Sequence, residues 1–196
     1  IDDALRSSYI NEIIVATDNQ QTAELAKVKG AKIPALRPGY LSEEYFNVID
    51  VLNWALEEVE KSGTVPDLVV VLEETMPFRP LHLIDEMIMR LVDKGLESII
   101  AVKEEPRRLW LQNKEEIRPS NDYFIPRKFS EERTFISLFG LGFVARTNLV
   151  REGGVFGNNT AIYEVHNPFC QVEIRDEESL KIGAPFIKRM ITEKFK

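Results

Sequence analysis

Short apolar segments rich in β-branched residues alternate with helical patterns along the first half of the chain, and this alternation most limits its possible folds. Strand-like segments lie near residues 12–17, 31–35, 68–73 and 97–103, and helical patterns lie near 19–29, 44–61 and 83–92. Strands that are apolar throughout are typical of a parallel sheet covered on both faces. We therefore expect one α/β domain over residues 1–196, a three-layer α/β/α sandwich with a mostly parallel sheet.

The alternation of strand-like and helical patterns stops after Lys103. Residues 104–133 are rich in charge, include three prolines and carry large apolar side chains such as Trp110. Apolar surface of this kind is usually covered, often by a second copy of the same chain, so we expect a homodimer that uses this excursion. The alternative is a hairpin that folds back on its own domain, with Trp110 filling the core.

Charge and cysteine usage restrict the classes of binding partner and the cellular compartment that we expect. The formal net charge is −7, which disfavours non-specific binding to nucleic acid, because that binding needs clustered Lys and Arg. A substrate with phosphate or carboxylate groups would need a local cationic site. No apolar run approaches the roughly 20 residues of a membrane span, so no membrane partner is expected. Cys170 is the single cysteine, which suits a reducing compartment such as the cytoplasm.

A series of short motifs resembles, in order, those of the acylneuraminate cytidylyltransferases. Residues 13–18 read IIVATD where the family has VVSTD, and residues 36–38 read LRP, as the family does. Residues 72–79 read LEETMPFR where it has LQPTSPLR, and ESIIAV at 97–102 resembles DSVVSV. Residues 149–154 with Tyr163 resemble LxxGG…Y, and VEIRDEESL at 172–180 stands at the place of IDIDTEEDL. The order and spacing of these motifs favour the nucleotide-diphospho-sugar-transferase fold.

The resemblance implies a reaction and a set of site residues. The expected enzyme is a nucleotidyltransferase that joins CTP to an acidic, sialic-acid-like sugar, giving the CMP-sugar and pyrophosphate with the help of Mg²⁺. The candidates for nucleotide and substrate binding are Arg37, Glu73, Thr75, Arg79 and Arg127, and the candidate metal ligand is Glu173. Thr75 and Arg79 follow the most strand-like segment, and ligands of open α/β sheets bind beyond the carboxyl ends of strands. Arg127 lies in the excursion, from which it could reach the site of a dimer partner.

The sequence also departs from the family. The family begins with a strand and a glycine- and lysine-bearing loop that cradles the CTP phosphates, and we expect any such loop to lie upstream of Ile1. Glu73, Glu74 and Met76 stand where the family has Gln, Pro and Ser. Arg175 stands at the family's second metal-binding Asp, and an Arg can occupy that space only as a fixed cation.

Each candidate also has a simpler interpretation. Arg37 could be an ordinary loop residue, Arg79 could be solvated at the start of a helix, and Glu173 could serve near a helix start rather than hold a metal. Glu73 and Glu74 could bind a cation or repel an anionic substrate. For the whole chain, the alternative to an enzyme is a catalytically degenerate homologue that acts as a binding or scaffold subunit.

Overall fold

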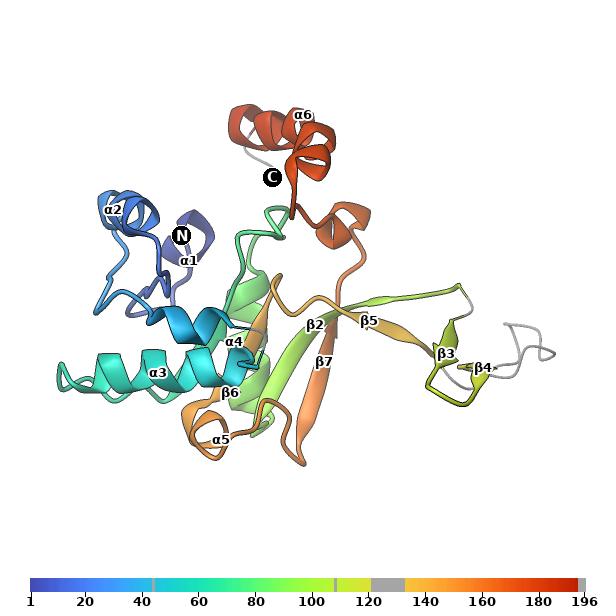
Figure 1. Cartoon of the computed structure of the whole chain (residues 1–196), viewed down its shortest axis with the longest axis horizontal. Helices are drawn as coiled ribbons and strands as arrows, with labels where there is room; N and C mark the ends of the chain where they lie inside the picture. Colours follow the sequence, from blue (N-terminus) through green and yellow to red (C-terminus); the bar gives the residue numbers. More distant parts are fainter. Residues whose placement is uncertain (44, 108, 121–132, 194–196) are drawn as a thin grey trace.

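The computed structural model describes residues 1–43, 45–107, 109–120 and 133–193, with side chains up to residue 189 (Figure 1). The helices are α1 (Asp2–Leu5), α2 (Gln20–Val28), α3 (Val48–Glu60), α4 (Leu83–Asp93), α5 (Thr147–Arg151) and α6 (Glu177–Glu193), with 3₁₀ turns η1 (Gly39–Ser42) and η3 (Pro168–Gln171). The strands are β1 (Leu68–Val71), β2 (Ser98–Glu104), β3 (Trp110–Gln112), β4 (Ile117–Pro119), β5 (Phe135–Ser137), β6 (Phe143–Arg146) and β7 (Thr160–Glu164). In this part of the chain, no helix is both long and apolar enough to cross a membrane.

Helices cover both faces of the central sheet, which confirms the predicted three layers (Figure 1). Successive residues of a strand point to opposite faces. Ile99 and Ala101 of β2 therefore pack with α4, in a core that includes Leu83, Met87 and Leu91. Ile100 and Val102 face the other way, toward Leu56 of α3 and the α5 residues Leu149 and Val150. Because both faces are covered, Ser98 to Val102 are all buried.

The direction of the strands differs from the prediction. The sheet has the order β1-β6-β2-β5, and β7 pairs with β2 on its other edge. β6 is antiparallel to both β1 and β2, β5 is antiparallel to β2, and only the pairing of β7 with β2 is parallel. The prediction of a mostly parallel sheet is therefore wrong for these pairings. β1 and β2 do run in the same direction, as the strand–helix–strand rhythm indicated, but β6 lies between them and comes from much later in the chain.

The two segments nearest the N-terminus are extended without forming regular strands. Ile14 and Lys32 form one parallel bridge, in which the Val15 N–H donates to the Lys32 carbonyl at 3.1 Å and the Lys32 N–H donates to the Ile13 carbonyl at 2.7 Å. A strand is stabilised by hydrogen bonds along its edges, and neither segment pairs with a named strand of the described residues. The edge of β1 that faces away from β6 also pairs with no other strand of the described residues. β1 is only half-buried, although its sequence LVVV is apolar throughout. The prediction that residues 12–17 and 31–35 join the main sheet is therefore wrong.

The chain leaves the sheet after β2. The antiparallel hairpin β3–β4 stands away from the core in Figure 1. The side chain of Trp110 is exposed (58% of its surface), so it does not fill the core of its own domain. Residues 121–132, which include the candidate Arg127, lie outside the described residues.

The loop that follows β1 is fixed by the buried side chain of Arg79, which is 7% exposed. Its Nε donates to the Leu141 carbonyl at 2.5 Å, and its second terminal nitrogen donates to the carbonyls of Gly140 at 2.9 Å and Glu73 at 3.3 Å. Its first terminal nitrogen is 2.7 Å from a carboxylate oxygen of Asp3. One guanidinium thus joins the loop after β1, the turn between β5 and β6, and α1.

An aromatic cluster holds the C-terminal helix against the same loop. Phe78 is buried, and its ring centroid lies 6.1 Å from that of Phe169 and 6.5 Å from that of Phe186. Phe169 and Phe186 are themselves 5.1 Å apart. Aromatic rings at these distances interact favourably beyond the area they bury. The cluster therefore brings the chain between η3 and α6 close to the residues that follow β1.

We expect Arg79→Ala to lower the free energy of unfolding by about 2–4 kcal/mol, because it leaves three carbonyls and the Asp3 carboxylate without their buried donor. The measurement is urea unfolding followed by circular dichroism. The matched control is Arg6→Ala, which removes an exposed partner of the same carboxylate, at 3.1 Å, and should change stability by less than about 1 kcal/mol. Equal effects of the two variants would contradict the anchoring role of Arg79.

Candidate functional site

The loop after β1 lies directly against the turn between β5 and β6. The Glu73 N–H donates to the Gly140 carbonyl at 2.8 Å, and the Thr75 hydroxyl donates to a Glu73 carboxylate oxygen at 3.1 Å. A β-carbon added at Gly140 would lie only 2.7 Å from the β-carbon of Glu73. Glycine is therefore required at residue 140 for the Glu73 side chain to take this place.

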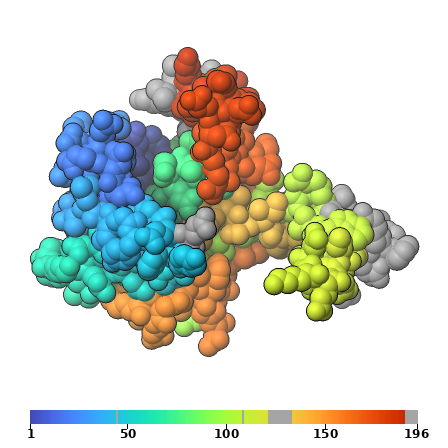
Figure 2. Space-filling view, in the orientation of Figure 1, coloured from blue at the N-terminus to red at the C-terminus, as the bar shows by residue number. Residues whose placement is uncertain are grey.

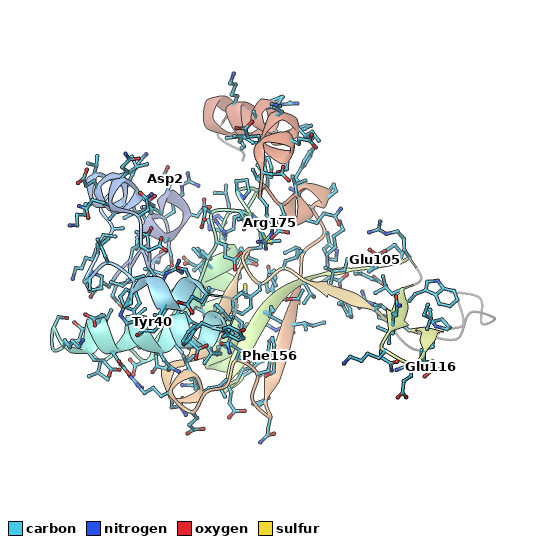
Figure 3. All side chains as sticks on the ribbon, in the orientation of Figure 1. Asp2, Tyr40, Glu105, Glu116, Phe156 and Arg175 are labelled. Carbon is cyan, nitrogen blue, oxygen red and sulfur yellow. The ribbon has the colours of Figure 1, made fainter. Side chains whose placement is uncertain are left out.

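The segment before α6 is the third part of this site. The Ile174 N–H donates to the Thr75 carbonyl at 2.7 Å, which fixes residues 173–175 beside the loop. Residues 173 and 175 flank this hydrogen bond, and Arg175 forms an ion pair with Glu173 at 2.5 Å. The sequence-predicted residues Glu73, Thr75 and Glu173 are thus brought together, although residues 73 and 173 are far apart in the chain. Figure 3 shows Arg175 where the chain that leads to α6 passes the loop after β1.

The charges around Arg175 are mainly negative. The hydrogen bond and the charge of Glu173, supported by the charges of Glu73 and Glu74, raise the pKa of Arg175 above its usual value. The guanidinium is charged at every physiological pH in any case, so the shift reports the surroundings rather than a titration. Glu173 is therefore the main source of the negative charge that acts on Arg175.

Arg79 lies at the base of the site and has a different environment from the one expected. It is neither solvated at a helix start nor open to a ligand, because four of its five N–H donors are directed at Leu141, Gly140, Glu73 and Asp3. In this arrangement it positions the loop that carries Glu73 and Thr75.

Arg37 belongs to a second cluster, at the ends of the two parallel extended segments. The Arg37 N–H donates to the Thr17 carbonyl at 2.8 Å. A terminal nitrogen of its guanidinium donates to the Ser42 hydroxyl at 2.9 Å and lies 3.5 Å from the Asp18 carboxylate. Ser42 in turn donates to Asp18 at 2.7 Å, and this hydrogen bond is the main cause of the lowered pKa of Asp18.

This second cluster includes two residues that were not predicted as site residues, Asp18 and Ser42. Asp18 ends the motif IIVATD, so its position was a usable signal, whereas nothing near Ser42 in the sequence indicated its role. The Nε atom of Arg37 is buried and has no hydrogen-bond partner among the described residues. Buried donors are almost always paired, so this atom is a candidate contact for a ligand. In Figure 2 the loop after β1 lies between the α1–α2 region, in blue, and α6, in red.

The described residues show no metal site made of protein ligands alone. Among them, no three His, Cys, Asp or Glu side chains are grouped so that they could hold a metal. Mg²⁺ is usually bound by one or two carboxylates together with phosphates and water. Glu173, the predicted ligand, is instead engaged by Arg175.

Sequence comparisons relate part of the chain to known enzymes. No family model matches. The chain is 31% identical over 105 residues to the CMP-N,N'-diacetyllegionaminic acid synthase of Legionella pneumophila, and 25% identical over 104 residues to the pseudaminic acid cytidylyltransferase of Campylobacter jejuni. Each match covers 53% of this chain and 45% of the relative. The chain thus matches less than half the length of these curated relatives.

Solved structures show the same fold over nearly the whole chain. CMP:2-keto-3-deoxy-manno-octonic acid synthetase, solved in complex with CTP, superposes with a TM-score of 0.67 at 13% identity, covering 96% of this chain and 85% of that one. The 4-diphosphocytidyl-2C-methyl-D-erythritol synthase of Anaerococcus prevotii superposes with a TM-score of 0.65 at 11% identity, covering 96% and 86%. These likenesses confirm the nucleotide-diphospho-sugar-transferase fold. The sequence matches add that about half of the chain is similar to part of the cytidylyltransferases of nonulosonic acids.

Proposed function

We propose that the protein is a cytidylyltransferase that activates a nonulosonic, sialic-acid-like sugar with CTP. The observation that carries the proposal is the convergence of residues 73–75, 140 and 173–175, because it assembles at one place two separate motifs that resemble the cytidylyltransferases. The relatives support the same chemistry, since their names specify cytidylyl transfer to legionaminic and pseudaminic acids. They do not favour the alternative of a degenerate scaffold subunit.

The proposed reaction exchanges a phosphoanhydride bond of CTP for a phosphate ester bond to the sugar. An oxygen of the sugar's anomeric hydroxyl forms a bond to the α-phosphorus of CTP, the bond from that phosphorus to the bridging oxygen breaks, and pyrophosphate leaves. The hydroxyl proton passes to a base that we do not assign. Negative charge increases at the phosphorus during this step, so fixed cations stabilise it. The cations available at the two clusters are Arg37 and Arg175.

The predicted binding residues have distinct proposed roles. Arg37 contacts the nucleotide through its unpartnered Nε, while Thr75 and Glu73 line the substrate side of the loop after β1. Arg127 is retained as a proposed contact from a dimer partner. We further propose that Mg²⁺ reaches the protein as its complex with CTP, since the described residues form no resident site for it.

The cellular location is a separate proposal that rests on cysteine usage. We propose that the protein acts in the cytoplasm. Its single cysteine, Cys170, is a buried free thiol, as is usual for proteins of a reducing compartment.

We expect calorimetry to show that the purified protein binds CTP in the presence of Mg²⁺ more tightly than ATP or UTP. Arg37→Ala should weaken CTP binding about tenfold or more, because it removes a charge-assisted hydrogen-bond donor. The matched control is Arg151→Ala, which removes an arginine that pairs with Glu60 where α5 contacts α3 and belongs to neither cluster, so it should leave binding unchanged. Equal affinity for all three nucleotides, or no binding of any, would contradict the proposed substrate.

The proposed dimer has its own test. Trp110 and Ile117 are exposed on one face of the hairpin β3–β4, and a second copy of the chain would cover this apolar face. Sedimentation at micromolar concentration should give twice the chain mass of 22.5 kDa. Trp110→Glu should shift the protein to a monomer with an unchanged circular dichroism spectrum, because a charge would be buried in the interface. A wild-type protein that sediments as a monomer would refute the dimer.

A further inference from the structure

The guanidinium of Arg37 is held at a terminal nitrogen, while its Nε is left without a partner. The terminal nitrogen donates to the Ser42 hydroxyl at 2.9 Å. Within residues 1–43, 45–107, 109–120 and 133–189, the buried Nε finds no hydrogen-bond acceptor. An arginine side chain has many rotamers, so a contact that fixes its terminal nitrogen also decides where the Nε–H points.

Ser42 makes two hydrogen bonds that suit it for holding Arg37. Its hydroxyl accepts from Arg37 and donates to a carboxylate oxygen of Asp18 at 2.7 Å. A carboxylate only accepts hydrogen bonds, so the hydroxyl proton is directed at Asp18 and the oxygen lone pairs remain for the guanidinium. The direct distance from Arg37 to Asp18 is 3.5 Å, beyond the roughly 2.7–2.9 Å of a charge-assisted hydrogen bond. Ser42 is therefore the closer link between the two charged groups.

The backbone brings these three residues together from separate parts of the chain. Leu41 of η1 is buried and so anchors the turn that carries Ser42. The Arg37 N–H donates to the Thr17 carbonyl at 2.8 Å, which places Arg37 beside Asp18. The hydroxyl is thus in position before any ligand binds.

We propose that Ser42 is a positioning residue for nucleotide binding: its hydroxyl, bridged to Asp18, holds the terminal nitrogen of Arg37 and leaves the Nε–H directed at an anionic oxygen of the nucleotide. Without the hydroxyl, the guanidinium is free to turn or to pair with Asp18 directly, and either movement takes the Nε–H away from that place. The identity of the ligand as a nucleotide rests on the proposed function, whereas the hold of Ser42 on Arg37 does not.

The hold of Ser42 on Arg37 is tested without any ligand. The measurement is the heteronuclear NOE of the Arg37 Nε–H group by NMR, with Arg37→Lys to assign the signal. The NOE should be close to that of the backbone in the wild type and should fall in Ser42→Ala, because the side chain becomes mobile. Ser42→Thr keeps the hydroxyl and should restore the wild-type value. Equal NOE values in the wild type and Ser42→Ala would overturn the inference.

The effect on nucleotide binding is tested by calorimetry with CTP and Mg²⁺. Ser42→Ala should weaken binding about three- to tenfold, and Ser42→Thr should recover most of this loss. In the double variant Arg37→Ala/Ser42→Ala the loss should equal that of Arg37→Ala alone, because Ser42 acts only through Arg37. The matched control is Ser62→Ala, which removes a hydroxyl that donates to the Val59 carbonyl at 2.6 Å and should leave binding unchanged.

The outcomes separate this inference from the proposed function. Losses that add in the double variant, or a Ser42→Ala protein that binds CTP as tightly as the wild type, would refute the role of Ser42 even though CTP binds. A wild type that binds no CTP would refute the proposed function and with it the nucleotide as the ligand, while the NMR measurement would still decide whether Ser42 holds Arg37. Ser42 is exposed, so its replacement should leave the circular dichroism spectrum unchanged.

Discussion

The arrangement of the candidate site depends on one buried guanidinium. Arg79 donates to carbonyls of two separate loops and pairs with Asp3, so it replaces the strand pairing that neither loop has. A buried charge is tolerated only when it is paired and its donors are used, and the environment of Arg79 meets both conditions. The loop after β1 can therefore hold Glu73 and Thr75 in place without regular secondary structure.

The sheet shows which parts of this fold the sequence could predict. The segments that became β1, β2 and α4 were recognisable, because their apolar patterns are satisfied by local burial. Strand direction was not, because β6 reaches its place between β1 and β2 through contacts with residues far earlier in the chain. Residues 12–17 were equally strand-like in sequence, but a β-branched apolar pattern becomes a strand only where a neighbour supplies hydrogen bonds. Here the pairing is limited to one bridge between Ile14 and Lys32.

The candidate site, like the sheet, could be predicted from the sequence only in part. The motif resemblance selected Glu73, Thr75 and Glu173 as candidates one by one, and the fold brings the two segments that carry them side by side. It could not give the role of Arg79, since burial decides between a ligand contact and an internal anchor, and a local sequence of Pro77-Phe78-Arg79-Pro80 suits both. The motif resemblance also could not predict the hydrogen bonds among Arg37, Asp18 and Ser42, because the turn η1, which positions Ser42, contains no distinctive residue.

Local charge matters more than net charge for a protein that is proposed to bind a triphosphate. The chain carries a formal charge of −7, but charges in water are screened over about 8 Å at physiological ionic strength, so a bound anion responds mainly to the groups that touch it. At the site, carboxylates would repel that anion unless a cation faced it. A bound metal ion supplies such a cation only while it stays bound, and its affinity must be maintained by several ligands in fixed geometry. A guanidinium is part of the chain and supplies a positive charge permanently, although it carries one unit of charge where a divalent ion carries two. Arg175, which stands where the resembling motif has an Asp, keeps a positive charge at this place, so this departure from the motif is compatible with the binding of an anion.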